Sequence, residues 1–162
     1  MNIRLASSND IFLIHQLANA IWHSTYKSIL PIEQIEFMLS KMYSIESLQS
    51  QLDEGITFIF AEAEGKALAF ASYSLSDSQQ FIYKIHKLYI LPEEQGKGLG
   101  THLTNFIKRD ARAKGGKILE LNVNRNNPAQ NFYRKYGFEV FEEVDIPYYQ
   151  YTLNDYVMRM IL

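Results

Sequence analysis

A glycine-rich stretch between an expected strand and an expected helix most constrains this chain. The segment Gln95-Gly96-Lys97-Gly98-Leu99-Gly100 follows the apolar, β-branched run 81–91, which Pro92 ends. Glycines at such a turn let backbone N–H groups approach a ligand, and the helix N-terminus adds unpaired N–H groups and partial positive charge. The sequence therefore predicts a phosphate or pyrophosphate site. The helix itself is predicted by apolar residues at helical spacing: Leu99, Leu103, Phe106, Ile107 and Ala111.

The order of the glycines excludes the two commonest phosphate-binding loops. A dinucleotide fingerprint requires G-x-G-x-x-G, whereas Gly96, Gly98 and Gly100 read G-x-G-x-G. A P-loop requires Ser or Thr after Gly-Lys, whereas Gly98 follows Lys97. The remaining pattern, Gln-x-x-Gly-x-Gly, resembles the acetyl-coenzyme A signature of the GNAT superfamily of N-acetyltransferases.

A second block strengthens this resemblance. Residues 126–138 read N-N-P-A-Q-N-F-Y-R-K-Y-G-F, similar to the other half of the family signature, in which Asn precedes Ala, then an aromatic-Tyr pair, then Gly-Phe. Gly137 can adopt the left-handed conformation that closes a helix. The family Asn matches Asn126 when counted back from Ala129, and Asn127 when counted from the preceding strand, 118–123. Both remain candidates.

Composition fits a cytoplasmic enzyme of one domain, residues 1–162. The net charge of −2 offers no basic surplus for nucleic acid, and we expect no membrane span and no signal peptide. The absence of cysteine excludes disulfides, thiolate metal sites and a cysteine nucleophile. His15 and His23 have no companion ligands, so no metal site is expected. A homodimer remains open.

The periodicity predicts an α/β chain. Ser8 or Asn9 can cap a first helix, and Pro31 opens a second one. The resemblance implies a mixed, mostly antiparallel central sheet flanked by helices, with a splayed pair of parallel strands that holds the cofactor. Expected strands lie at 3–6, 57–63, 67–73, 81–91, 118–123, 138–144 and 151–160, with a hairpin at 64–66 and further helices at 31–38 and 45–52.

The resemblance also implies how acetyl-coenzyme A is held. Backbone groups of Leu88, Tyr89 and Ile90 would pair with the pantetheine arm, and the N–H of Ile90 would point at the thioester oxygen, as an oxyanion site does. The amine would attack directly in a ternary complex, without an acyl-enzyme. The other cofactor-binding candidates are Gln95, Gly96, Lys97, Gly98, Leu99, Gly100, Thr101, Asn126, Asn127, Ala129, Phe132, Tyr133 and Lys135.

Two proton transfers need residues. Tyr133 stands where the family places its general acid; the alternative is a core tyrosine. His86 stands where similar sequences often carry Glu, and it is expected to share strand parity with Leu88 and Ile90. A neutral imidazole there would act as base, directly or through water, with a rate that rises near pH ~6–7. The alternatives are a solvated histidine, with Glu120 or water as the base.

The acceptor site is expected among aromatic residues: Trp22, Tyr26, Tyr73 and Tyr83. Aromatic walls accept a cationic amine, although they also pack ordinary cores. Residues 22–52 and 154–158 distantly resemble bacterial polyamine acetyltransferases, which implies a polyamine or other small amine, with a peptide N-terminus as the further option. A rival interpretation is a catalytically idle acetyl-coenzyme A sensor or scaffold, although the retained Tyr133 and glycine turn count against it.

Overall fold

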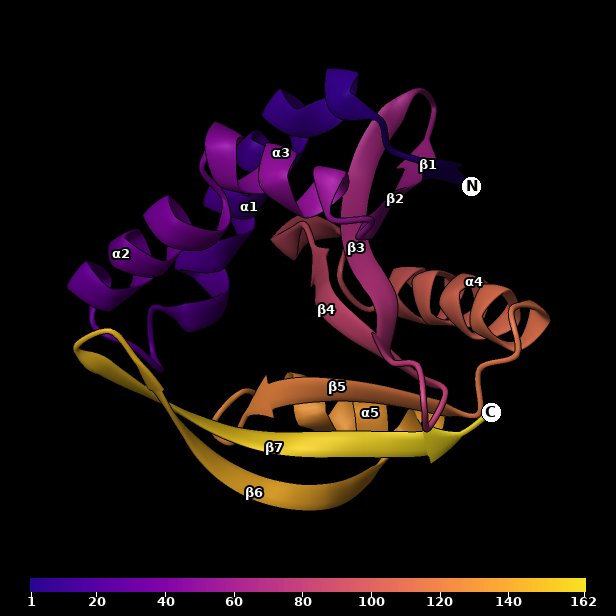
Figure 1. Ribbon diagram of the computed structural model, residues 1–162. Coiled ribbons are helices and arrows are strands. Elements are labelled where there is room, and N and C mark those ends of the chain that lie inside the picture. Colours follow the sequence, from indigo (N-terminus) through magenta and orange to yellow (C-terminus); the bar gives the residue numbers. More distant parts are fainter.

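A seven-stranded sheet in the order β1-β2-β3-β4-β5-β7-β6 forms the centre of the computed structural model, which describes residues 1–162 (Figure 1). Only the β4–β5 pair is parallel. This arrangement confirms the expected mixed, mostly antiparallel α/β fold. The strands are β1 (Asn2–Leu5), β2 (Thr57–Ala63), β3 (Lys66–Asp77), β4 (Ile82–Ile90), β5 (Ile118–Asn124), β6 (Glu139–Tyr148) and β7 (Tyr151–Ile161).

Helices cover both faces of the sheet (Figure 1). Three of them, α1 (Ile11–Tyr26), α2 (Ile32–Met42) and α3 (Ile45–Asp53), enclose one apolar cluster against β2, β3 and β4. The others, α4 (Leu99–Ala113) and α5 (Ala129–Tyr136), enclose a second cluster on the opposite face. None of the helices is both long and apolar enough to span a membrane.

Local sequence explains most element boundaries. Ser7, rather than Ser8 or Asn9, begins the first helical segment, because its hydroxyl accepts the N–H of Asn9 while Asp10 accepts the N–H of Ser7. Glu64 and Gly65 both have positive φ, the requirement of a tight hairpin between β2 and β3. Strand β6 runs further than predicted and includes Pro147. Proline has no N–H to donate, but β6 is an edge strand, where such a residue is tolerated.

Strands β4 and β5 part in the middle of the sheet. Their pairing runs from Ile82 opposite Ile118 to Ile85 opposite Leu121 and stops there, although β4 continues beside β3 and β5 beside β7. Ser72 is paired with Lys87, and Tyr73 with Ile85, so His86 is an extra residue in β4. Such a bulge bends its strand and increases the twist. The splayed parallel pair is therefore present.

We predict that α4 is held to the sheet mainly by its apolar face. The side chain of Ile107 is fully buried and Arg109 is exposed. Ile107→Ala should lower the free energy of unfolding by about 2–5 kcal/mol, because a cavity remains beneath the helix. Arg109→Ala should change it by less than about 0.5 kcal/mol. Urea unfolding of the two variants measures the difference, and equal effects would contradict the assignment.

Candidate functional site

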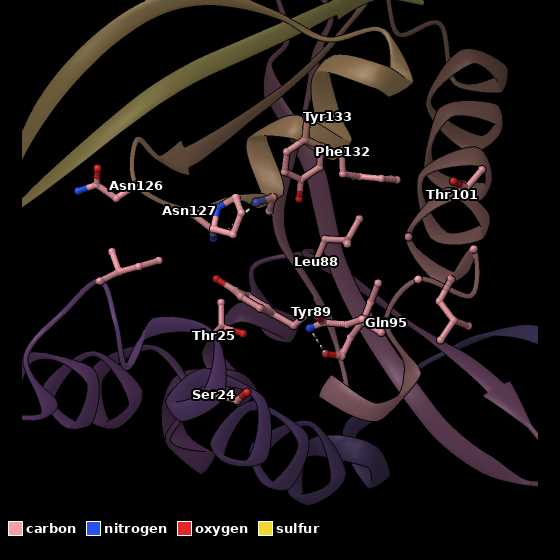
Figure 2. A pocket seen from close by; sticks show the side chains of 18 of the residues that line it. Ser24, Thr25, Leu88, Tyr89, Gln95, Thr101, Asn126, Asn127, Phe132 and Tyr133 are labelled. Carbon is pink, nitrogen blue, oxygen red and sulfur yellow. Dashed lines mark hydrogen bonds between the residues drawn. The ribbon is translucent and has the colours of Figure 1, made fainter.

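A cleft of about 860 Å³ opens where β4 leaves β5 (Figure 2). Its walls come from β4, the glycine turn with the start of α4, the start of α5, and the end of α1 with the loop that follows. A smaller cavity of about 50 Å³ shares Leu88, Tyr89, Asn127, Ala129 and Tyr133 with it. The cleft thus brings together the two sequence blocks. It is lined by Ser24, Thr25, Ser28, Ile29, Leu88, Tyr89, Ile90, Gln95, Gly96, Gly98, Leu99, Gly100, Thr101, Asn126, Asn127, Pro128, Ala129, Phe132 and Tyr133.

The glycine turn leaves backbone donors open to the cleft. Gly96 and Gly98 have φ of 78° and 85°, and a Cβ at either position would meet no atom within 4 Å. Helix α4 starts directly after Gly98, and no side chain caps it. The first N–H groups of a helix have no partner inside it, so this end of the cleft suits an anion. A Cβ at Gly100 would lie 3.1 Å from Phe132 Cζ, so glycine allows α4 to approach α5 closely.

The edge of β4 beyond the bulge offers further donors. Leu91 donates its N–H to Leu68, and bonded pairs alternate along an antiparallel ladder. Tyr89 therefore pairs with β3 through its backbone, and the N–H groups of Leu88 and Ile90 face the gap toward β5. The side chain of Gln95 donates to the carbonyl of Ile90 at 3.3 Å, which ties the glycine turn to this edge (Figure 2).

Tyr133 holds a protonated phenol at the cleft. The residue is buried in the second cluster, yet its hydroxyl points from α5 into the cleft (Figure 2). Burial raises the pKa of Tyr133 above that of an ordinary tyrosine, and the nearby Tyr26 raises it further. The hydroxyl therefore keeps its proton at neutral pH and is available as a donor.

A pair of tyrosines forms the wall opposite α5. The hydroxyls of Tyr26 and Tyr89 lie 3.0 Å apart. Burial raises the pKa of both, so each phenol stays neutral. Trp22 packs behind them, with its ring 4.5 Å from that of Tyr26 and 5.7 Å from that of Tyr89. Tyr26 lines the smaller cavity and stays a candidate acceptor residue, whereas Trp22 is buried and supports it from the core.

His86 borders the smaller cavity from the bulge in β4. Its Nε2 lies 2.7 Å from Oγ of Ser74. Although the residue is exposed at the surface, partial burial of the ring lowers the pKa of His86 to about 4, and Lys87 and Lys84 add to the effect. The imidazole is therefore neutral throughout the physiological range. The expected inflection at pH ~6–7 moves to lower pH accordingly.

The structure separates the two candidate asparagines. Asn127 is buried, its side-chain carbonyl accepts the N–H of Ala129 at 2.9 Å, and it borders both cavities. Asn126 is exposed and points away from α5 (Figure 2). Asn127 therefore fixes the start of α5, as an Asn near a helix N-terminus does.

Several sequence-predicted site residues lie elsewhere. Lys97 and Lys135 are exposed and border neither cavity, and Nζ of Lys97 bonds Glu94 at 3.1 Å. Tyr73 donates to Asp110 beneath α4 at 2.7 Å, and Tyr83 is buried in the same cluster. These two tyrosines are corrected from acceptor residues to core residues. Glu120 accepts a hydrogen bond from Arg159 at 2.7 Å and borders neither cavity.

Sequence reasoning missed five lining residues. Four of them, at the end of α1 and just after it, face the cleft because α1 packs across β4: Ser24, Thr25, Ser28 and Ile29. The fifth is Pro128. The available signal was the presence of Ser24, Thr25 and Ser28 within a few residues of Trp22.

The cleft suits an acyl donor that carries phosphates, because open backbone N–H groups lie at one end and a protonated phenol lies near the strand gap. The fold and the site therefore define the class of acyltransferases. The model of the "Acetyltransferase (GNAT) family" matches residues 15–138, and the chain belongs to this family of N-acetyltransferases.

Relatives agree over nearly the whole chain. A spermidine N(1)-acetyltransferase of Thermoplasma acidophilum is 29% identical over 151 residues, which cover 90% of this chain and 91% of that one. The crystal structure of the PaiA N-acetyltransferase from the same organism, in complex with coenzyme A, has a TM-score of 0.86 at 26% identity and covers 100% of both chains. YncA from Salmonella typhimurium, solved with acetyl-CoA, has a TM-score of 0.70 at 20% identity, with 99% and 93% coverage, and shows the fold alone.

We predict that the His86 imidazole titrates near pH 4. In the unfolded chain its pKa is ~6.5, so the unfolded state binds more protons between these values. This group therefore lowers the free energy of unfolding as the pH falls from ~6.5 toward 4. NMR titration of the imidazole measures the pKa directly. Lys84→Gln should raise it by removing a neighbouring cation, and a parent value near 6.5 would contradict the assignment.

Proposed function

We propose that the chain transfers the acetyl group of acetyl-coenzyme A to a primary amine by direct attack in a ternary complex. The observation that carries this proposal is the convergence of three donors on one cleft. These donors are the N–H groups of the glycine turn, the free N–H groups of β4 and the protonated hydroxyl of Tyr133. The family membership and the coenzyme A bound to a relative support acetyl-coenzyme A as the source of the acetyl group.

The residues present fit acetyl-coenzyme A. The open space above Gly96 and Gly98 and the uncapped start of α4 would receive the pyrophosphate. The exposed edge of β4, at Leu88 and Ile90, would receive the pantetheine arm as an additional strand would. Asn127 and Ala129 would border that arm from the start of α5. Lys97 and Lys135 are exposed and border neither cavity, so they lie outside this proposed set.

Acetyl-coenzyme A supplies an activated acetyl thioester when bound. The N–H of Ile90, which faces the gap toward β5, would stabilise negative charge on the thioester oxygen. Tyr133 holds its proton at the phenolic oxygen and would give it to the departing thiolate. No covalent acyl-enzyme is required, and the chain has no cysteine to form a thioester of its own.

His86 is the proposed base for the attacking ammonium. Its neutral ring at the smaller cavity can accept a proton directly or through water. Glu120 suits this role less, because Arg159 binds its carboxylate. A basicity lowered by burial also means that the imidazole takes the proton only transiently, which favours relay to solvent.

The proposed acceptor is a polyamine or another small amine, with a peptide N-terminus as the alternative. The spermidine-acetylating relative supports the first option. Release of coenzyme A thiol from acetyl-coenzyme A, measured across a panel of polyamines, amino sugars, amino acids and peptides, tests the reaction and ranks the acceptors. Binding of acetyl-coenzyme A without turnover on any amine would favour the idle sensor or scaffold instead.

We predict that Gly98→Ala weakens acetyl-coenzyme A binding at least tenfold. The φ of 85° strains any side chain, and the new methyl group stands where backbone N–H groups would approach pyrophosphate. Gly65→Ala is the matched control, because it imposes a similar strain at φ 76° in the β2–β3 hairpin, away from the cleft. Calorimetric titration compares the two. Equal affinities of the two variants for acetyl-coenzyme A would contradict a role of the glycine turn in cofactor binding.

We predict that Tyr133→Phe lowers kcat by about 10²-fold, the scale of a lost general acid. The apolar ring keeps its packing against Phe132 and Phe138, so affinity for acetyl-coenzyme A should stay within about twofold. Steady-state kinetics and calorimetry separate the two effects. Parental turnover in Tyr133→Phe would show that Tyr133 is not the general acid and serves only in packing.

A further inference from the structure

Asp155 lies on the sheet face that also carries α1 to α3. It belongs to β7, where it is opposite Asn124 of β5 and Val144 of β6. Its neighbours Tyr156 and Met158 belong to the cluster beneath α4 and α5, and Leu153 packs against the cluster of α1 to α3. Because side chains alternate along a strand, Asp155 shares a face with Leu153.

The carboxylate of Asp155 is half-buried and has no cation within 4 Å. Arg125 bonds the carboxylates of Asp145 and Glu143 and, at Asp155, reaches only the backbone carbonyl. By contrast, Glu120 on the neighbouring strand has Arg159 as its partner at 2.7 Å. A partly buried carboxylate without an ion-pair partner costs stability, and a cationic ligand beside it would offset that cost.

The surroundings of Asp155 connect it to the smaller cavity. Asn122 lines that cavity, and the register that pairs Asn124 with Asp155 and Asn122 with Val157 makes Asp155 its diagonal neighbour on the adjoining strand. Tyr26, another lining residue, has its pKa raised mainly by burial, and the charge of Asp155 adds to the effect. Burial also raises the pKa of Asp155 overall, and Lys84 and Arg125 only partly oppose this. Asp155 lines neither cavity itself, but it lies next to Asn122 and therefore close to the smaller cavity that His86 also borders.

We propose that Asp155 binds the second, non-reacting ammonium group of a diamine or polyamine acceptor. This inference rests on the proposed acetyl transfer. A carboxylate stabilises the protonated form of an amine, which would hinder the attacking nitrogen but suits one that stays charged. The neutral phenols of Tyr26 and Tyr89 would flank the carbon chain between the two nitrogens.

The test compares 1,4-diaminobutane with butylamine, which has the same carbon chain and only one nitrogen. The parent should use the diamine with the higher kcat/KM. Asp155→Asn should lower kcat/KM for the diamine at least tenfold, mainly through KM, and leave butylamine within about twofold. Asp53→Asn is the matched control, because it removes an equal charge from an exposed site on α3. It should leave the preference for the diamine intact.

Binding measurements keep this inference separate from the proposed reaction. Affinity of acetyl-coenzyme A should be unchanged in Asp155→Asn, and the coenzyme A complex of the parent should bind 1,4-diaminobutane at least tenfold more tightly than that of the variant. A diamine preference or diamine affinity retained in Asp155→Asn overturns the role of Asp155. Turnover absent on every amine overturns the reaction, and calorimetry with the diamine still decides the role of Asp155.

A thermal melt distinguishes a structural role. Because burial opposes the charged carboxylate, the neutral amide in Asp155→Asn should keep the Tm of the parent at pH 7 or raise it. A fall in Tm with unchanged diamine kinetics would show that Asp155 only supports the β5–β7 pair, and would overturn the proposal. If Asp155→Asn does not fold, Asp155→Ser removes the same charge with a smaller side chain and undergoes the same measurements.

Discussion

The parting of β4 from β5 is the constraint on which the rest of the site depends. Their ladder ends at Ile85 and Leu121, and the bulge at His86 bends β4 away while β3 still holds it. This break leaves the N–H groups of Leu88 and Ile90 without a partner on a neighbouring strand, whereas buried backbone groups in a sheet are normally hydrogen bonded. An extended ligand that adds to this edge would restore the missing pairing, so the gap in the sheet is itself the binding feature.

Burial, rather than ion pairing, controls the electrostatics of the cleft. Tyr26, Tyr89 and Tyr133 remain protonated because a phenolate would lose hydration among apolar neighbours. The same effect keeps His86 neutral. No lysine or arginine lines the cleft, so backbone N–H groups and the start of α4 are its source of positive potential. Such fixed dipoles need no reorganisation when charge develops.

Local motifs made the fold and most of the cleft predictable. The glycine turn and residues 126–138 carry the family resemblance that implied the cofactor-binding residues, and both blocks border the cleft. Strand parity was less reliable: the bulge places His86 beside Ser74, whereas Leu88 packs beneath α4 and α5, so the expected shared parity was wrong. Tyr73 was misassigned because the sequence does not show which face of the sheet an aromatic residue occupies. Ser28 was missed because only tertiary packing brings it to the cleft beside β4.

The two proton-transfer residues of the proposed reaction have pKa values displaced in opposite directions. His86 loses its proton near pH 4, and Tyr133 keeps its own beyond the range of an ordinary tyrosine. Between these limits neither group titrates, so both hold the protonation states that a base and an acid require. An alkylammonium acceptor would itself titrate within this interval. The pH dependence of acetyl transfer would then report the ionisation of the amine rather than a titration of His86 or Tyr133.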